Sequence, residues 1–295
     1  MPLHLADYRD LVALDHPVEP AEPAAVVERP GLLGHVVRHL LAERTGARLG
    51  VDPDIPDARD VVELRRLLRA LLTVRGAEPL PPHVHLAIDR IMQAERDERG
   101  TIAAASLPRV RGHSSIALWQ GDITTLGVDA IVNAANAEML GCFRPFHACI
   151  DNAIHAAAGP RLREDCGRIM ALQGHAEPNG QAKATRGYHL PASFVVHTVG
   201  PIVRNVLQPE HEAVLAGCYR ACLDLARELQ GVRSIAFCAI ATGVFGFPKV
   251  AAARIAVRTV AEWLEAHPDA LDLVVFNVFT EADRAVYQDV LEEGA

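Results

Sequence analysis

The chain has 295 residues, of which 50% are hydrophobic and 22% charged, a composition that fits one large folded domain or two modest ones. Its formal charge of −8 excludes an overall attraction for nucleic acid, although a local basic face is compatible with it. Six cysteines are too few to crosslink a chain of this size, so we expect thiols or metal ligands in a reducing compartment.

The first third of the chain predicts helices. Apolar residues recur at helical spacing in 32–41 and in 61–72, and a third helical run covers Val84 to about Arg96. Pro108 and Gly112 then mark a boundary. We therefore expect a small helical N-terminal extension over 1–110 and a second unit over 111–295.

Neither a targeting segment nor a membrane span is expected. The first residues, as far as Pro17, are acidic and interrupted by proline, unlike a signal peptide. No stretch approaches the ~20 apolar residues that cross a bilayer. The default expectation is a cytoplasmic monomer that contacts neither membrane nor nucleic acid.

Strands alternate with helices after the boundary. The expected strands are 115–119, 128–132, 183–188, 194–198, 234–239 and 273–278. The expected helices are 151–158, 161–172, 209–229, 250–266 and 282–291. This alternation predicts an α/β fold in which helices cover both faces of a sheet.

Polar side chains follow the first two strands of this unit. Asp122 comes just after a strand end, where its carboxylate either accepts a hydrogen bond from an adenine amine or caps the next turn. Asn133 and Asn136 end the next strand, and they either hold a sugar hydroxyl or satisfy the local backbone.

A cysteine–histidine loop precedes the next helix. Cys142, His147 and Cys149 offer two thiolates and one imidazole, a donor set that suits zinc. Three protein ligands leave one position open for water or substrate, as in a catalytic zinc site. The alternative is two buried cysteines beside a histidine of the core.

A glycine-containing loop, 240–248, joins a strand to the helix that begins near Lys249. Gly243 and Gly246 let the backbone approach a ligand closely, and the helix directs N–H groups toward a bound anion. That arrangement suits a pyrophosphate, and a simple strand-to-helix turn is the alternative. The sequence matches neither the P-loop nor the dinucleotide-binding pattern.

Other reactive residues are interpreted as structural. His35 and His39 lie four residues apart on a helix without a carboxylate partner, and three arginines form a solvated basic ridge on the next helix: Arg65, Arg66 and Arg69. Three cysteines in apolar surroundings are assigned to the core, namely Cys218, Cys222 and Cys238.

As a set, the segments 121–124, 128–136, 150–155 and 242–247 resemble the macrodomain family, a three-layer α-β-α fold with a mixed central sheet that binds ADP-ribose. The inserted cysteine–histidine loop resembles the microbial zinc-dependent branch of protein-ADP-ribose hydrolases. The helical run 63–75 resembles the N-terminal extension of that branch.

The resemblance implies roles for individual residues. Cys142, His147 and Cys149 are implied to hold Zn²⁺, and Asn136 and Asp151 to be catalytic. The ADP-ribose contacts that it implies are those of Asp122, Ile123, Asn136, Cys149, Ile150, Asp151, Ala241, Thr242, Gly243, Val244 and Phe245.

The implied activity is zinc-dependent removal of mono-ADP-ribose from protein side chains, with O-linked groups favoured. The partners are then ADP-ribose and mono-ADP-ribosylated protein. One alternative is a non-catalytic ADP-ribose reader with a structural zinc. Another is a deacetylase acting on O-acetyl-ADP-ribose.

Overall fold

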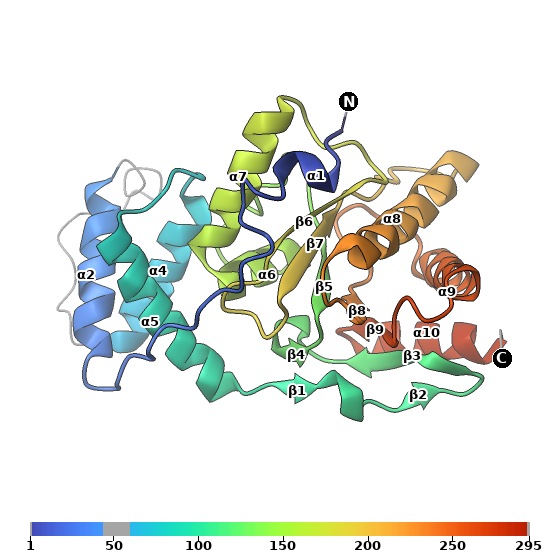
Figure 1. Ribbon diagram of the computed structural model, residues 1–295, viewed down its shortest axis with the longest axis horizontal. Coiled ribbons are helices and arrows are strands. Elements are labelled where there is room, and N and C mark those ends of the chain that lie inside the picture. The colour runs from blue at the N-terminus through green and yellow to red at the C-terminus, as the bar shows by residue number, and fades with distance from the viewer. Residues whose placement is uncertain (1, 44–59, 294–295) are drawn as a thin grey trace.

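A computed structural model describes residues 2–43 and 60–293 of the chain (Figure 1). On one side of the molecule, α2 (Arg29–Ala42), α4 (Val61–Val74) and α5 (Pro82–Arg99) pack against one another. These three helices have a hydrophobic core of their own, which includes Leu33, Val37, Leu40, Leu68, Leu71 and Ile88. One face of each helix is apolar, and these faces form the shared core.

The rest of the described chain is built on a mixed, seven-stranded sheet. In spatial order the strands are β2 (Arg109–Val110), β3 (His113–Gln120), β9 (Leu273–Val278), β8 (Ser234–Phe237), β5 (Ala130–Ala134), β7 (Phe194–Thr198) and β6 (Ala182–Arg186). The five central strands run parallel, and each outer strand is antiparallel to its neighbour. Parallel strands require cover on both faces.

Helices supply that cover and make three layers (Figure 1). One face carries α6 (Ile150–Ala158) and α7 (Pro160–Gln173), which contact β5 and β6. The other face carries α8 (Pro209–Glu228), α9 (Lys249–Ala266) and α10 (Glu281–Glu293). The predicted α-β-α architecture with a mixed sheet is confirmed.

The first residues of the chain pack on the sheet rather than on the helical extension. The short helix α1 (Leu5–Tyr8) and the turn after it bury Leu5, Tyr8, Val12 and Leu14 in the core of the sheet. The Tyr8 hydroxyl accepts a hydrogen bond of 2.9 Å from the N–H of Ala184 on β6. Since β6 is an outer strand of the sheet, this contact satisfies a donor that no neighbouring strand pairs.

Some element bounds differ from those expected. The strand β6 ends at Arg186, because Tyr188 has a φ of 53° and lies in the left-handed region, where a strand cannot continue. The strand β5 begins and ends two residues later than expected, so Asn133 lies within it. The short strands β1 (Ile102–Ala103) and β4 (Leu126–Gly127) pair with each other outside the main sheet.

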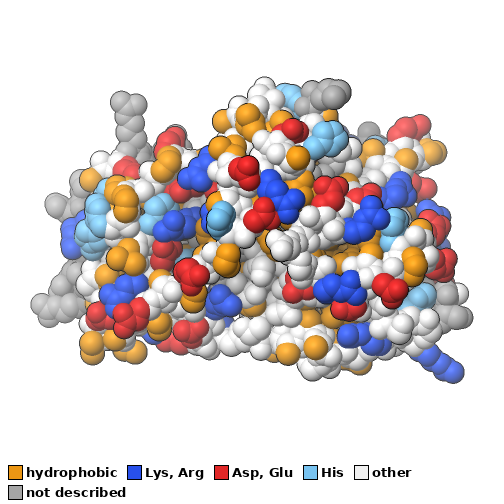
Figure 2. All heavy atoms as spheres, in the orientation of Figure 1, with side chains coloured by type: hydrophobic (Ala, Val, Ile, Leu, Met, Phe, Trp, Pro, Cys, Tyr) orange, Lys and Arg blue, Asp and Glu red, His pale blue; other side chains and the backbone are white. Residues whose placement is uncertain are grey.

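Charged side chains are mixed over the face seen in Figure 2, where acidic and basic groups alternate without a large patch of one sign. The charge of −8 therefore leaves room for locally basic surfaces. Across residues 2–43 and 60–293, every helix is too short or too polar to cross a membrane.

Candidate functional site

Two asparagine side chains at the end of β5 have buried oxygens that lack a donor. Asn133 Nδ2 donates to Asp151 Oδ1 over 2.8 Å and lies 3.1 Å from His197 Nδ1. Asn136 Nδ2 donates to the carbonyl of Gly141 over 3.1 Å. Both Oδ1 atoms are left without a hydrogen-bond partner among the described residues. Buried acceptors of this kind require donors, and hydroxyl groups of a ligand would supply them.

Asp151 lies in the first turn of α6 with its carboxylate buried. Burial raises the pKa of Asp151 to about 6, and the Asn133 hydrogen bond and the Arg163 charge offset part of that rise. His155 follows one turn later, with Nε2 3.5 Å from Asp151 Oδ1. Burial lowers the pKa of His155 far below its usual value, and the nearby charges of Arg163 and His197 lower it further. His155 is therefore neutral beside the carboxylate.

The loop before α6 is fixed by its own backbone and by the helix. The N–H of His147 donates to the carbonyl of Arg144 over 3.2 Å, and Asn152 Nδ2 donates to the same carbonyl over 2.9 Å. Cys149 is the N-cap of α6, and its Sγ accepts a hydrogen bond of 3.4 Å from the N–H of Asn152. We call residues 141–149 the metal loop.

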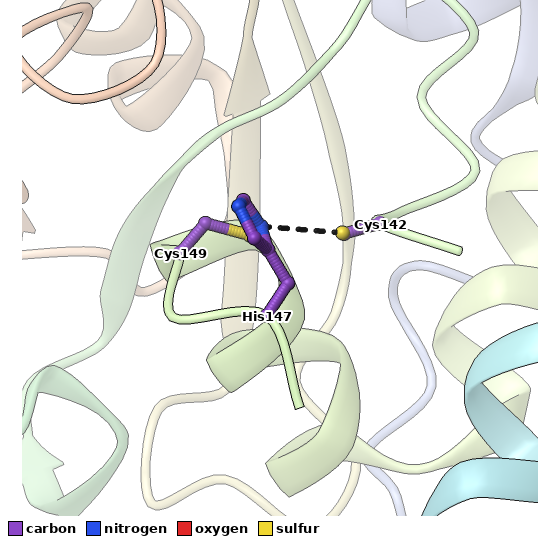
Figure 3. A group of neighbouring side chains, drawn as sticks. All are labelled: Cys142, His147 and Cys149. Carbon is purple, nitrogen blue, oxygen red and sulfur yellow. Dashed lines mark hydrogen bonds between the residues drawn. The ribbon is translucent and has the colours of Figure 1, made fainter. Parts of the chain in front are cut away.

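The metal loop brings its three expected ligands together, as Figure 3 shows. Cys142 Sγ lies 3.6 Å from His147 Nδ1, and the ligand atoms of Cys142, His147 and Cys149 all lie within 4.8 Å of one another. Tetrahedral zinc with ordinary bond lengths separates a sulfur and a nitrogen ligand by about 3.6 Å. The donor set and its spacing therefore fit zinc.

Burial also affects the thiol of Cys149. It raises the pKa of that thiol to about 11, although the N–H of Asn152 acts in the opposite direction. The thiol alone is therefore protonated at neutral pH, and a bound divalent cation is the partner that would hold it as a thiolate.

A second group of metal-type side chains, His155, Cys166 and His197, lies in the interior behind the metal loop. Here both ring nitrogens of His197 are already used. Its Nδ1 accepts from Asn133, and its Nε2 lies 2.9 Å from Thr185 Oγ1. We therefore interpret this group as packed support for Asn133 rather than as a metal site.

Gly141 begins the metal loop at a position that only glycine fits. Its φ is 80°, and a Cβ there would lie 2.9–3.0 Å from ring atoms of His155. The close approach of this backbone to the ring keeps His155 beside Asp151.

The loop between β8 and α9 presents a run of free backbone donors. The N–H groups of Thr242, Gly243, Val244 and Phe245 have no acceptor within the part of the chain that the structure describes. Gly246 closes the turn with a φ of 71°, and a Cβ there would lie 2.8 Å from a backbone oxygen. Consecutive N–H groups at a helix start suit an anion such as a pyrophosphate.

Asp122 caps the turn and keeps one carboxylate oxygen free. Its Oδ1 accepts from the N–H of Thr124 over 2.9 Å and from the Thr124 hydroxyl over 2.8 Å, so the carboxylate caps the turn. Its Oδ2 has no hydrogen-bond partner among the described residues and is available to an exocyclic amine. The next residue, Ile123, is buried in the core.

Arg163 on α7 is a site residue that the sequence analysis missed. Its Nη1 donates to the carbonyls of Leu72 and Arg75, each over 2.7 Å, at the end of α4. Its Nε donates to the carbonyl of Leu140 over 2.6 Å, just before the metal loop. The guanidinium therefore joins the helical extension to that loop, and no local pattern around position 163 marks it as buried.

His155 was missed as well, although a signal for it exists. It stands four residues after Asp151, and this spacing places both side chains on one face of a helix.

Comparisons with known proteins show the family of the chain. The Macro domain family model matches residues 132–256. A protein-ADP-ribose hydrolase of Treponema medium is 47% identical over 239 residues, which make up 80% of this chain and 90% of that protein. A protein of the same name from Staphylococcus aureus is 45% identical over 234 residues, or 79% of this chain and 86% of that one.

A solved structure is similar over a comparable span. The Trypanosoma brucei macrodomain in complex with ADP-ribose superposes with a TM-score of 0.58 and 32% identity, covering 75% of this chain and 94% of that one. The chain therefore belongs to the macrodomain family of protein-ADP-ribose hydrolases.

Proposed function

We propose that this protein is a zinc-dependent ADP-ribosylhydrolase that removes mono-ADP-ribose from protein side chains, O-linked ones in particular. One observation carries the proposal. The atoms of Cys142, His147 and Cys149 converge at the start of α6, and the first turn of the same helix carries the buried carboxylate of Asp151. The residues that would hold a metal and a buried proton acceptor therefore lie together at one end of α6.

The ADP-ribose would lie along the carboxyl ends of the central strands. Asp122 Oδ2 and the Ile123 backbone meet the adenine, and the free N–H groups from Thr242 to Phe245, beyond Ala241, hold the pyrophosphate. The unpartnered Oδ1 of Asn136 accepts from a hydroxyl of the distal ribose. The backbone at Ile150 completes the pocket beside Cys149.

The residues that would hold the metal are Cys142, His147 and Cys149. When bound, Zn²⁺ supplies a Lewis acid that polarises an oxygen of the distal ribose or of the linkage.

The reaction breaks the bond between the anomeric carbon of the distal ribose and the protein oxygen. A water oxygen forms the new bond to that carbon, and the electron pair of the old bond stays on the protein oxygen, which gains a proton. The Asp151 carboxylate orients the water and accepts its proton, while Asn133 holds Asp151 in place. Asn136 keeps the ribose in register with the water.

The test combines metal analysis with turnover. We expect about one zinc per chain in the purified protein, and its loss in Cys142→Ala and His147→Ala. Turnover on mono-ADP-ribosylated protein should fall roughly a hundredfold or more in both variants. Affinity for free ADP-ribose, measured by calorimetry, should fall much less. The matched control is His16→Ala, which removes an exposed histidine outside the site.

Three outcomes would contradict the proposal. Full turnover in a zinc-free variant removes the metal from the reaction. Tight ADP-ribose binding without release from serine-, aspartate/glutamate- or arginine-linked peptides makes the protein a reader. Faster turnover of O-acetyl-ADP-ribose than of every peptide makes it a deacetylase of small metabolites.

A further inference from the structure

Two arginines of the helical extension lie against the metal loop. The guanidinium carbons of Arg66 and Arg69 on α4 lie 5.4 Å and 6.0 Å from the ring centroid of Phe146. Phe146 directly precedes the metal ligand His147. The extension and the metal loop therefore share one continuous surface beside the metal ligands.

The aromatic ring at the centre of this surface is exposed and held by an unusual backbone. The side chain of Phe146 is 47% exposed, and its φ of 59° lies in the left-handed region, which bulky residues rarely adopt. An exposed ring and a strained backbone both oppose stability at this position. Features of that kind persist where a function depends on them.

The positive charge on this surface is not neutralised. Neither Arg66 nor Arg69 forms an ion pair within residues 2–43 and 60–293, whereas the neighbouring Arg65 is paired with Glu95. Arg144, on the metal loop itself, is also exposed and free of ion pairs among the same residues. Each guanidinium that stacks on a ring keeps its N–H donors available for carboxylates.

We propose that Arg66, Arg69, Arg144 and Phe146 form a docking surface for an acidic segment of the ADP-ribosylated protein, an inference that rests on the proposed function. The polypeptide next to the modified residue has to leave the site past the metal loop, since the distal ribose lies there. A chain of charge −8 repels acidic targets overall and needs a local basic contact to hold them. A short basic surface suits a short acidic peptide, whereas nucleic acid requires a long basic stripe.

The test uses two peptides that carry the same ADP-ribosylated residue, with the linkage that the enzyme cleaves fastest. One peptide has glutamates around the modified residue and the other has glutamines. We expect the wild-type enzyme to favour the glutamate peptide through KM, with a preference that weakens as salt rises. In Arg66→Gln/Arg69→Gln, kcat/KM for the glutamate peptide should fall about fivefold to tenfold, and the glutamine peptide should be unaffected.

A control variant with the same change in net charge is Arg220→Gln/Arg258→Gln. It removes two exposed arginines from α8 and α9, far from α4 in Figure 1, and should leave the preference intact. Equal losses on both peptides in Arg66→Gln/Arg69→Gln would overturn the inference, because the arginines would then only support the metal loop. Equal wild-type turnover of the two peptides would also overturn it, as would inhibition by short DNA at lower concentration than by polyglutamate.

Failure of the proposed function gives a different result. If neither peptide is hydrolysed, the proposed function fails, and the docking surface is then judged by peptide binding in an Asp151→Ala variant. Tighter binding of the glutamate peptide that depends on Arg66 and Arg69 would still support the surface. Equal binding of the two peptides would overturn it.

Discussion

The amide of Asn133 connects the proposed catalytic carboxylate to the interior of the sheet. Its Nδ2 carries two hydrogens, and one goes to Asp151 Oδ1 while the other faces His197 Nδ1. His197 must therefore accept at Nδ1 and carry its proton on Nε2, where Thr185 Oγ1 receives it. The orientation of Asp151 thus depends on a histidine that lies 46 positions further along the chain.

Gly141→Ala should disturb the site because it adds one carbon atom beside His155. The new Cβ would lie within about 3 Å of the His155 ring, on a left-handed backbone, so His155 or the metal loop has to move. We expect a loss of about 2–3 kcal/mol in the free energy of unfolding and at least about a tenfold loss of turnover. Thermal unfolding and peptide hydrolysis measure the two effects.

The control variant Gly174→Ala separates the effect of the contact with His155 from the effect of backbone strain. Gly174 also has a left-handed φ, 74°, but a Cβ there meets nothing within 4 Å. This variant should lose about 1 kcal/mol of stability and keep its turnover. Equal turnover losses in the two variants would show that the contact with His155 has no role.

Sequence spacing anticipated some of these residues and not others. The three proposed metal ligands lie within eight positions of the chain, so their residue types and order were enough to predict the group. Arg163 and His197 act through partners that are 12 to 91 residues away in the chain, at Asp151, Asn133, Leu140 and the end of α4. Contacts of that kind depend on packing, and a single sequence carries no periodic signal for them.

Among the elements, the shortest ones were not predicted from the sequence. The helix α1 has four residues and β1 has two, too few to show a period, and both exist because tertiary contacts hold them. The longer helices, α4 and α9 among them, followed their apolar spacing closely. The shift of β5 has a local cause, because Asp129 turns away to accept from the N–H groups of Arg233 and Ser234.

Tyr8→Phe should weaken the attachment of the N-terminal segment to the sheet. The substitution removes one oxygen and leaves the buried N–H of Ala184 without an acceptor. We expect a loss of about 1–2 kcal/mol in the free energy of unfolding. Hydrogen exchange should accelerate at the Ala184 amide and remain slow in the central strand β5. An unchanged exchange rate at Ala184 would contradict the assigned contact.

For the whole molecule, buried polar contacts bind the two hydrophobic cores into one unit. Asp89 on α5 pairs with Arg161 over 2.7 Å and with His189 over 3.0 Å, and His85 on the same helix lies 2.9 Å from Glu164. With the Arg163 contacts, these pairs hold the extension against α7 and the metal loop. The position of the proposed docking surface relative to the metal ligands therefore depends on the fold as a whole.

The stability of the whole fold should fall as the solution becomes acidic. Burial lowers the pKa of His197 to about 3, well below the 6.5 of the unfolded chain, and shifts His155 in the same direction. Below pH 6.5 the unfolded chain therefore binds protons that the folded chain cannot. Each histidine should cost about 1.4 kcal/mol per pH unit once the pH is well below 6.5 and above the folded pKa. The raised pKa of Asp151, about 6, offsets part of this loss below about pH 6.

Urea unfolding between pH 7.5 and pH 5 measures this dependence. In His197→Gln the slope of the unfolding free energy against pH should decrease by about one proton. The exposed-site variant His16→Gln should keep the wild-type slope. A slope that is the same in His197→Gln and in the wild type would contradict a neutral His197 in the folded protein.

The Tyr8 hydroxyl, which pairs with a backbone donor on the outer edge of β6, also affects the association of one copy of the chain with another. An outer strand with free backbone groups is a template on which a second molecule can extend the same sheet. A shortened chain that starts after Leu14 would expose that template along β6. We expect such a chain to form polymers and scatter light on storage, while the full chain at the same concentration stays dispersed.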